Sequence, residues 1–481
     1  MSPVLDQRPF YLTWAVRAGP QHEAGQTGQW LQPERMLPGR PKLLTGMLAN
    51  EVLTLMKGGL YGLAGALVNL GGAWAMGHLL LLALRLRLPR MERRLFALVA
   101  GGAWWSAAAY LLARIHFASR GSFVALAAVA MLAAALVRAK HTTAESSPEP
   151  GGGLRWLLRA LLACYSLLYL VYALNPDSTV IHTPTRMTGQ LRPARPSAVE
   201  FLYLPAFSLG RQTGVALSSV ALLLALALGL TSYARWRGRT SAGVLAAALV
   251  FASPMAAAAA LTASPEPALA CALFYCFYAL ELYRATRQRP LLSLAALLLV
   301  FSFTIGVSAK AAPPADQPQL PAYLFGKAGE LTVRGAARQG LLGPVFLLAP
   351  LGLLALRQST GRRVLRAGAL AALWLAANPG PEAALPAASF TALAMGLALE
   401  NSTGMVPLLA VAHAVLSLPP VTGAYCWCEA WRLRDWPIER PNTQTSLTPR
   451  TISRGASFSS WRLDAGKPLE SSLRQSGMGD A

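Results

Sequence analysis

Long apolar segments alternate with short polar ones along most of the chain, from about residue 60 to residue 418. Many of them run for roughly 18 to 22 residues, which lets a helix cross about 30 Å of hydrocarbon. The pattern therefore predicts an all-α polytopic membrane protein with about twelve transmembrane helices. The expected spans are 60–84, 95–114, 121–138, 156–174, 213–232, 242–261, 267–283, 291–308, 341–356, 364–377, 384–399 and 404–418.

Basic residues mark every second connection between these spans. Arginines gather after the first, fifth, seventh and ninth spans and flank the connection after the third, whereas the alternate short loops are nearly free of Lys and Arg. Positively charged loops stay in the cytoplasm. We therefore expect both termini and two long loops, 175–212 and 309–340, on the outer side of the membrane.

Composition supports the membrane class. Hydrophobic residues make up 54% of the 481 residues and charged residues only 13%, against about 25% charged in soluble domains. The net charge of +22 is compatible with a nucleic-acid partner, but the basic residues lie in short loops and not on one amphipathic face. We expect a lipid bilayer and no nucleic acid as the partner of these charges.

Polar stretches divide the chain. Residues 1–46 are expected to be disordered, or to precede the true start if translation begins near Met47. Residues 47–140 are interpreted as accessory transmembrane helices and 141–154 as a cytoplasmic linker. The main transmembrane unit is expected over 155–420, and 421–481 as a polar, largely disordered tail.

Ionisable residues stand at three predicted outer helix ends. Asp177 and His182 follow the fourth span, Glu266 opens the seventh and Lys310 closes the eighth. Each alone also fits an ordinary role: Asp177 a turn, Glu266 a first-turn carboxylate favoured by the helix dipole, Lys310 an interface anchor, and His182 a loop position. Four loop arginines equally fit contacts with lipid headgroups: Arg186, Arg192, Arg195 and Arg211.

Five features follow one another in a recognisable order. They are Asp177 to His182 (DSTVIH), residues 200–210 (EFLYLPAFSLG), Ser253-Pro254, Glu266, and Gly306 to Lys310 (GVSAK). In this order, residues 155 to about 400 resemble the bacterial GT-C glycosyltransferases, in the branch of the protein mannosyltransferases and lipopolysaccharide core transferases. Ile181 stands where that branch has Tyr before the His, and Glu266 where it usually has Asp.

The resemblance implies an enzyme of the bacterial inner (plasma) membrane. It would move a hexose or pentose, with inversion, from a polyprenyl-phosphate-linked sugar to an extracytoplasmic glycan, lipid or protein. Asp177 would take the proton of the acceptor hydroxyl, and Glu266 or His182 would orient the acceptor. Lys310 and the four loop arginines would hold the departing phosphate. No His/Asp/Glu cluster indicates a metal or another cofactor, and a divalent cation stays open.

Two other classes remain possible on the sequence. A catalytically inactive GT-C-like membrane protein would keep the fold while Asp177 and Glu266 face different cavities. A transporter or flippase would place ionisable or unwound helix positions at mid-membrane, and few such positions occur in the main unit. Convergence of Asp177, Glu266 and Lys310 at one outer pocket would favour the enzyme.

Overall fold

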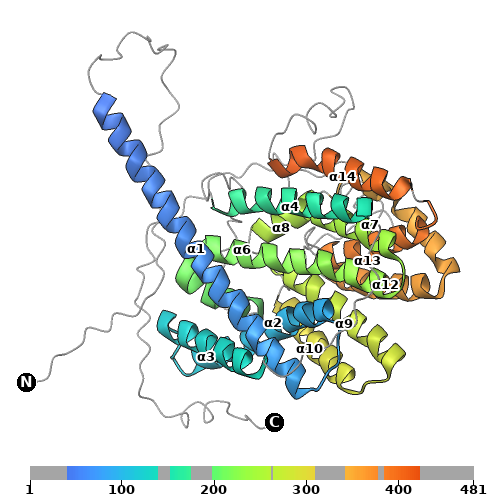
Figure 1. Cartoon of the computed structure of the whole chain (residues 1–481), viewed down its shortest axis with the longest axis horizontal. Helices are drawn as coiled ribbons and strands as arrows, with labels where there is room; N and C mark the ends of the chain where they lie inside the picture. The colour runs from blue at the N-terminus through green and yellow to red at the C-terminus, as the bar shows by residue number, and fades with distance from the viewer. Residues whose placement is uncertain are drawn as a thin grey trace, which may run out of the picture. The chain divides into compact units, whose positions relative to one another are not determined.

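The computed structural model describes residues 41–138, 152–174, 198–261, 264–308, 342–377, 384–402 and 404–422. Within these ranges the regular structure is helical and no strand occurs (Figure 1). The predicted N-terminal segment, linker and tail lie almost wholly outside them. The helices are α1 (Pro41–Ala83), α2 (Arg90–Arg114), α3 (Arg120–Arg138), α4 (Gly152–Leu174), α6 (Ala198–Trp236), α7 (Thr240–Phe251), α8 (Pro254–Leu261), α9 (Glu266–Thr286), α10 (Pro290–Ser308), the 3-10 helix η2 (Pro344–Arg357), α12 (Ser359–Ala377), α13 (Ala384–Ala398) and α14 (Met405–Thr422).

The all-α prediction is confirmed, but the predicted count of twelve spans is wrong. In the described part of the chain, six helices are long and apolar enough to cross a membrane, or seven if the bent pair α7–α8 forms one span. The other apolar helices have only 10–17 described residues. At 1.5 Å per residue, 17 residues reach about 26 Å, less than the ~30 Å of a typical hydrocarbon core. These shorter helices are Pro290–Ile305, Pro344–Arg357, Ala384–Ala398 and Met405–Leu418.

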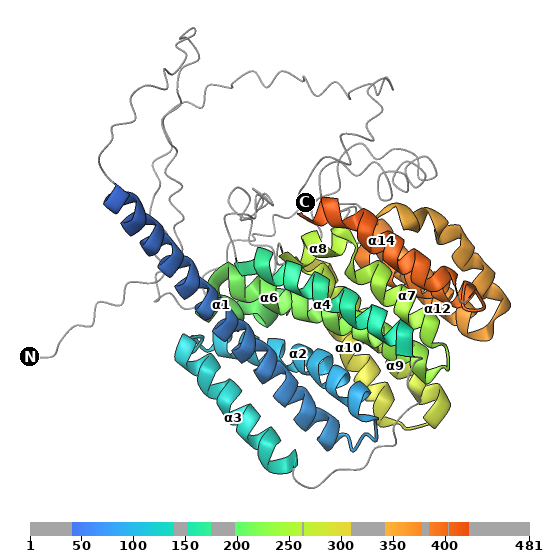
Figure 2. The ribbon, with the colours of Figure 1, turned by 45° about the horizontal axis from the view of Figure 1, so that its top comes forward.

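Glycines let α1 lie directly against α2 and α6. A Cβ atom added at Gly77 of α1 would overlap the backbone of Ala97 in α2, and one added at Gly101 of α2 would overlap that of Ala73 in α1. Figure 2 shows the long blue α1 passing along both neighbours. Helix pairs in membranes commonly use small residues in this way, because dispersion contacts between close backbones replace a hydrophobic driving force.

We expect Gly77→Ala to destabilise the protein by about 1–3 kcal/mol, the range of overpacked cores. The added methyl group would meet a backbone carbonyl that cannot move without separating α1 from α2. Thermal unfolding of the purified protein in detergent would measure the loss. Gly58→Ala is the matched control on the same helix, since its Cβ would have no neighbour within 4 Å. Equal melting temperatures for the two variants would contradict close α1–α2 packing.

Helix α6 consists of two segments that fold back on each other. Its backbone leaves helical geometry at Arg211, with φ 51° and ψ −143°. A Cβ built on Gly214 would lie 2.7 Å from the carbonyl oxygen of Ala206, although residues eight apart in a straight helix are separated by about 12 Å. Residues 198–210 therefore turn back along 212–236. The part of the predicted outer loop 175–212 that the structure describes is helical rather than irregular.

The remaining helices join α1–α3 around one continuous hydrophobic core, which includes residues from Ala66 to Ala410. Tyrosines of α4 fix its position: the Tyr169 hydroxyl donates to the Phe251 carbonyl, and the Tyr165 hydroxyl donates to the Ala414 carbonyl at 2.6 Å.

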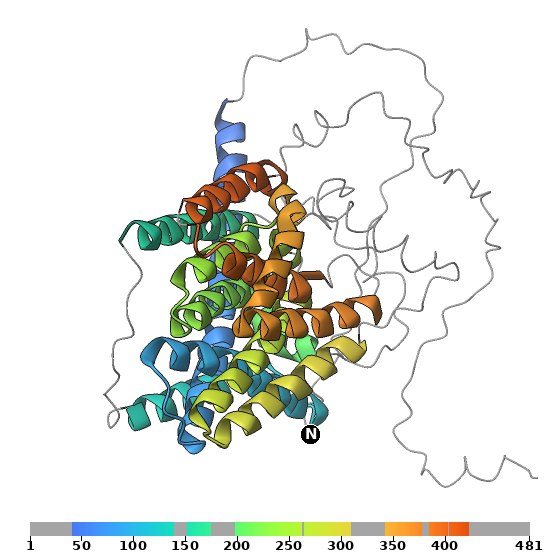
Figure 3. The ribbon, with the colours of Figure 1, turned by 90° about the vertical axis from the view of Figure 1, so that its right-hand side faces the viewer.

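Figure 3 shows α9 and α10 (yellow) as neighbouring helices. They are joined by a short turn, and the Cys276 Sγ lies 3.3 Å from the Ala295 carbonyl oxygen.

Candidate functional site

Most of the sequence-predicted site residues lie outside the described ranges. Their convergence at one pocket, including the placement of Asp177 against Glu266, therefore stays a prediction. Glu266 and Arg211 are described, and they allow the local geometry of the predicted outer end to be examined. The residues outside the described ranges are Asp177, His182, Arg186, Arg192, Arg195 and Lys310.

Glu266 begins α9, and its side chain is partly buried. Pro265 precedes it at the N-cap position, where a missing N–H leaves nothing unsatisfied. The carboxylate lies in the first turn and gains from the helix dipole, so a purely structural role accounts for part of its position. Tyr203 of α6 is buried and lies within the distance over which the Glu266 carboxylate acts on its hydroxyl. An acid and a phenol from two helices are thus near one another at this end of the bundle.

Further polar groups lie in and after the broken segment α7–α8 that leads to α9. Helices α7 and α8 are bent by 57° at a break that contains Ser253. Ser264 directly precedes the Pro265–Glu266 helix start. The hydroxyl oxygens of Ser253 and Ser264 are buried and make no hydrogen bond to another described residue. Buried polar groups nearly always have a partner, so these hydroxyls are open to a water molecule or a bound hydroxylated ligand.

Arg211 lies at the tip of the fold-back in α6, next to the start of the long 212–236 segment. Its side chain is exposed, and its positive φ is uncommon for a residue with a Cβ. Such backbone strain costs of order 1–3 kcal/mol and is concentrated at functional sites. Gly62 of α1 supports the turn by packing against Gly210.

The helices that lead to Asp177 and Lys310 end on the same side of the bundle as Glu266. The last residue of α4, Leu174, packs against Gly59 of α1, one turn from the contact between Gly62 and the fold-back of α6. Helix α10 runs antiparallel to α9, so its last residue, Ser308, lies toward the end where Glu266 begins α9. Three chain segments that carry predicted site residues are thus attached to one end of the bundle.

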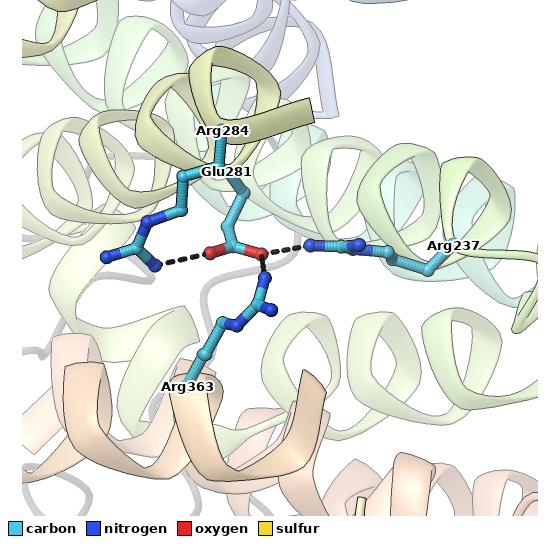
Figure 4. Close-up of polar contacts among 4 residues, drawn as sticks. All are labelled: Arg237, Glu281, Arg284 and Arg363. Atoms are coloured by element: carbon cyan, nitrogen blue, oxygen red, sulfur yellow. Dashed lines mark hydrogen bonds and ion pairs between the residues drawn. The ribbon is translucent and has the colours of Figure 1, made fainter. Parts of the chain in front are cut away.

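The opposite end holds a buried acid that the sequence analysis missed. Glu281 of α9 has a fully buried side chain and is paired with three arginines from three helix ends (Figure 4). Arg284 reaches one carboxylate oxygen at 2.7 Å, while Arg237 and Arg363 share the other, Arg363 at 3.1 Å. Arg237 also stacks over Trp236, with 4.3 Å between the guanidinium carbon and the ring centroid. We call these four residues the Glu281 hub.

Two more acids pair with arginines at this end. Glu92 of α2 accepts a hydrogen bond from Ser232 at 2.8 Å and lies 3.6 Å from Arg235, and Glu400 pairs with Arg239. These contacts bring together the ends of α2, α6, α9, α12 and α13, as the alternation of basic loops predicts. A signal for the acids was present: Glu92 and Glu281 are carboxylates within a turn or two of arginine-rich helix ends.

The arrangement defines a multi-pass α-helical membrane protein with an arginine-rich end and, opposite it, a polar end that contains Glu266. Among the described residues, no three His, Cys, Asp or Glu side chains are grouped so as to hold a metal ion. No protein-family model, curated protein or solved structure matches the chain.

Proposed function

We propose that this protein is an inverting glycosyltransferase of the GT-C type, acting at the polar end of the bundle on a polyprenyl-phosphate-linked sugar. The observation that supports the proposal most strongly is Glu266, held at a helix N-terminus near Tyr203 and two residues after Ser264, whose buried hydroxyl has no hydrogen-bond partner among the described residues. Hydroxyl-rich substrates need such groups to replace their hydration. The attachment of the Asp177 and Lys310 segments to the same end supports it further.

The reaction requires few groups from the protein. The acceptor oxygen attacks the anomeric carbon while the bond to the lipid phosphate breaks on the opposite face, which inverts the configuration. Asp177 takes the acceptor proton, and polyprenyl phosphate leaves with the bonding electrons. Phosphate is a good leaving group, so cations that stabilise its charge suffice in place of a general acid. Arg211 is exposed beside the polar end and is the predicted phosphate-binding arginine that lies within the described residues. A bacterial plasma membrane would supply both the lipid donor and the acceptor.

Glu266→Gln is expected to lower sugar transfer by about 10²-fold, because the loss of a positioning group displaces the acceptor from the base. The assay would use the purified protein in liposomes with polyprenyl-phosphate mannose or polyprenyl-phosphate arabinose and a cell-envelope extract as acceptor. Release of polyprenyl phosphate, followed by mass spectrometry, would measure transfer.

Glu400→Gln serves as the control, since Glu400 is a half-buried acid at the arginine-rich end. We expect it to leave transfer unchanged. If the folded, unaltered protein released no polyprenyl phosphate from either donor, the transferase proposal would fail.

Transport is the second candidate, and one observation favours it. The 57° bend between α7 and α8 interrupts a segment that would otherwise form one span, and broken helices often line the substrate sites of transporters. A transporter would move a labelled polyprenyl-phosphate sugar across liposomes without forming free polyprenyl phosphate. The assay above therefore separates the two functions if the label is also followed across the bilayer.

A further inference from the structure

A small cavity lies at the arginine-rich end of the bundle, away from the proposed reaction site. Its volume is about 200 Å³, and its walls come from the α1–α2 connection and from α2, α6, α9 and α10. Most of the lining is apolar or aromatic, including Trp236, Tyr278 and Leu291. A water molecule occupies about 30 Å³ of liquid, so the space is equivalent to about seven waters. It is smaller than the ~300–1,000 Å³ of pockets for drug-sized ligands.

Glu92 gives this apolar cavity an unfilled hydrogen-bond acceptor. The side chain is 2% exposed and lines the cavity. Its Oε1 atom accepts from Ser232 and faces Arg235, whereas its Oε2 atom is buried without a hydrogen-bond partner among the described residues. A buried carboxylate oxygen left in this state carries a desolvation penalty. The Tyr278 hydroxyl on the same cavity wall also has no hydrogen-bond partner among the described residues, so the carboxylate can accept either from this phenol or from a molecule in the cavity.

Arg87 supplies the opposite charge. It lies in the connection between α1 and α2, is exposed, and also lines the cavity. A ligand that suits both residues must carry an anionic group for the exposed arginine and a hydrogen-bond donor for the buried carboxylate. It must also be small enough for the cavity. Because arginines from the ends of α6, α7, α9 and α12 gather here, this face is expected at the depth of the cytoplasmic headgroups.

We propose that the cavity binds the headgroup of a membrane phospholipid whose phosphodiester bears a terminal hydrogen-bond donor. The phosphate contacts Arg87, the ammonium or hydroxyl group donates to Glu92 Oε2, and the acyl chains remain in the surrounding bilayer. Phosphatidylethanolamine and phosphatidylglycerol both have this chemistry. Phosphatidylcholine has the same phosphate and acyl chains, but its trimethylated nitrogen cannot donate. The site is independent of the proposed sugar transfer.

Native mass spectrometry of the purified protein, titrated with each lipid at matched acyl chains, tests this inference. Phosphatidylethanolamine, phosphatidylglycerol or both should bind about ten- to a hundredfold more tightly than phosphatidylcholine, which is the range of one hydrogen bond to a charged group. The difference between the first two lipids identifies the donor as ammonium or hydroxyl. Equal binding of all three lipids would overturn the proposal.

Variants of the cavity residues test whether the lipid preference arises at this site. Arg87→Gln should weaken all three lipids, whereas Glu92→Gln should abolish the preference over phosphatidylcholine, because an amide NH2 replaces the accepting oxygen. Arg289→Gln is the matched control, since Arg289 is exposed in the nearby α9–α10 turn but does not line the cavity. An equal loss in Arg87→Gln and Arg289→Gln would point to diffuse charge and contradict the site.

Glu92→Gln also disturbs the contact with Arg235, and this variant is informative only if it folds. Thr286→Trp avoids that difficulty, because Thr286 is an exposed cavity-lining residue that contacts neither charge. The indole would close the cavity while Glu92 keeps its protein partners. We expect the lipid preference to disappear in this variant, and its persistence would place lipid binding elsewhere.

Discussion

Glu281→Gln is expected to lower the stability of the protein by about 3–5 kcal/mol, the usual effect of removing one partner from a buried charge network. Glu281 is fully buried, and its carboxylate is the shared partner of Arg237, Arg284 and Arg363. The neutral amide would leave three guanidinium groups close together without the charge that balances them. Thermal unfolding in detergent, followed by intrinsic fluorescence, would measure the change.

The control for this prediction is Arg284→Ala. Arg284 is 59% exposed and three residues from Glu281 on the same helix, and exposed pairs of this kind contribute about 1 kcal/mol or less. Arg237 is only 22% exposed and comes from another helix end, so Arg237→Ala should cost more than Arg284→Ala. If Glu281→Gln unfolded at the same temperature as the unaltered protein, the hub would have no role in holding the helix ends together.

Asp177→Asn is expected to reduce sugar transfer by about 10²- to 10⁴-fold, the contribution of a general base. This prediction depends on the proposed function. Asparagine keeps the shape of the side chain but cannot accept the proton of the acceptor hydroxyl. The release of polyprenyl phosphate in liposomes would give the rates, and an unchanged melting temperature would separate lost catalysis from lost folding.

Asp316→Asn provides a matched control in the other predicted outer loop, because Asp316 belongs to none of the family-like motifs. We expect it to transfer sugar at the rate of the unaltered protein. Near-normal transfer by Asp177→Asn would remove Asp177 from the reaction and make Glu266 the next acid to test.

The sequence predicted the positions of the helices along the chain better than it predicted their lengths and bends. Apolar composition alone indicates a helix, and every predicted span overlaps one in the structure. Where prolines interrupt the pattern, the outcome depends on packing: Pro254 begins a new helix after a bend, whereas Pro350 lies inside the 3-10 helix η2. The fold-back at Arg211 had no comparable signal, because its support comes from Gly62 and Gly65 on α1, far away in the sequence.

The site was predictable only where a residue stands at a helix end. Glu266 was placed correctly at the start of a helix, because a long apolar run begins directly after it. Its neighbour Tyr203 could not be predicted, since the two come close only after residues 198–210 turn back along α6. The Glu281 hub depended in the same way on contacts between distant helices. Charge alternation predicted which helix ends meet, but not which acid would bind the arginines.

The order of synthesis sets the order in which the ion pairs of the Glu281 hub can form. The ribosome delivers Arg237 first and then Glu281 with Arg284, while Arg363 follows 82 residues after Glu281. The nascent chain thus holds the acid with two partners until α12 has been made. The last ion pair can form only after α12 has been made, while α13 and α14 still remain to be synthesised.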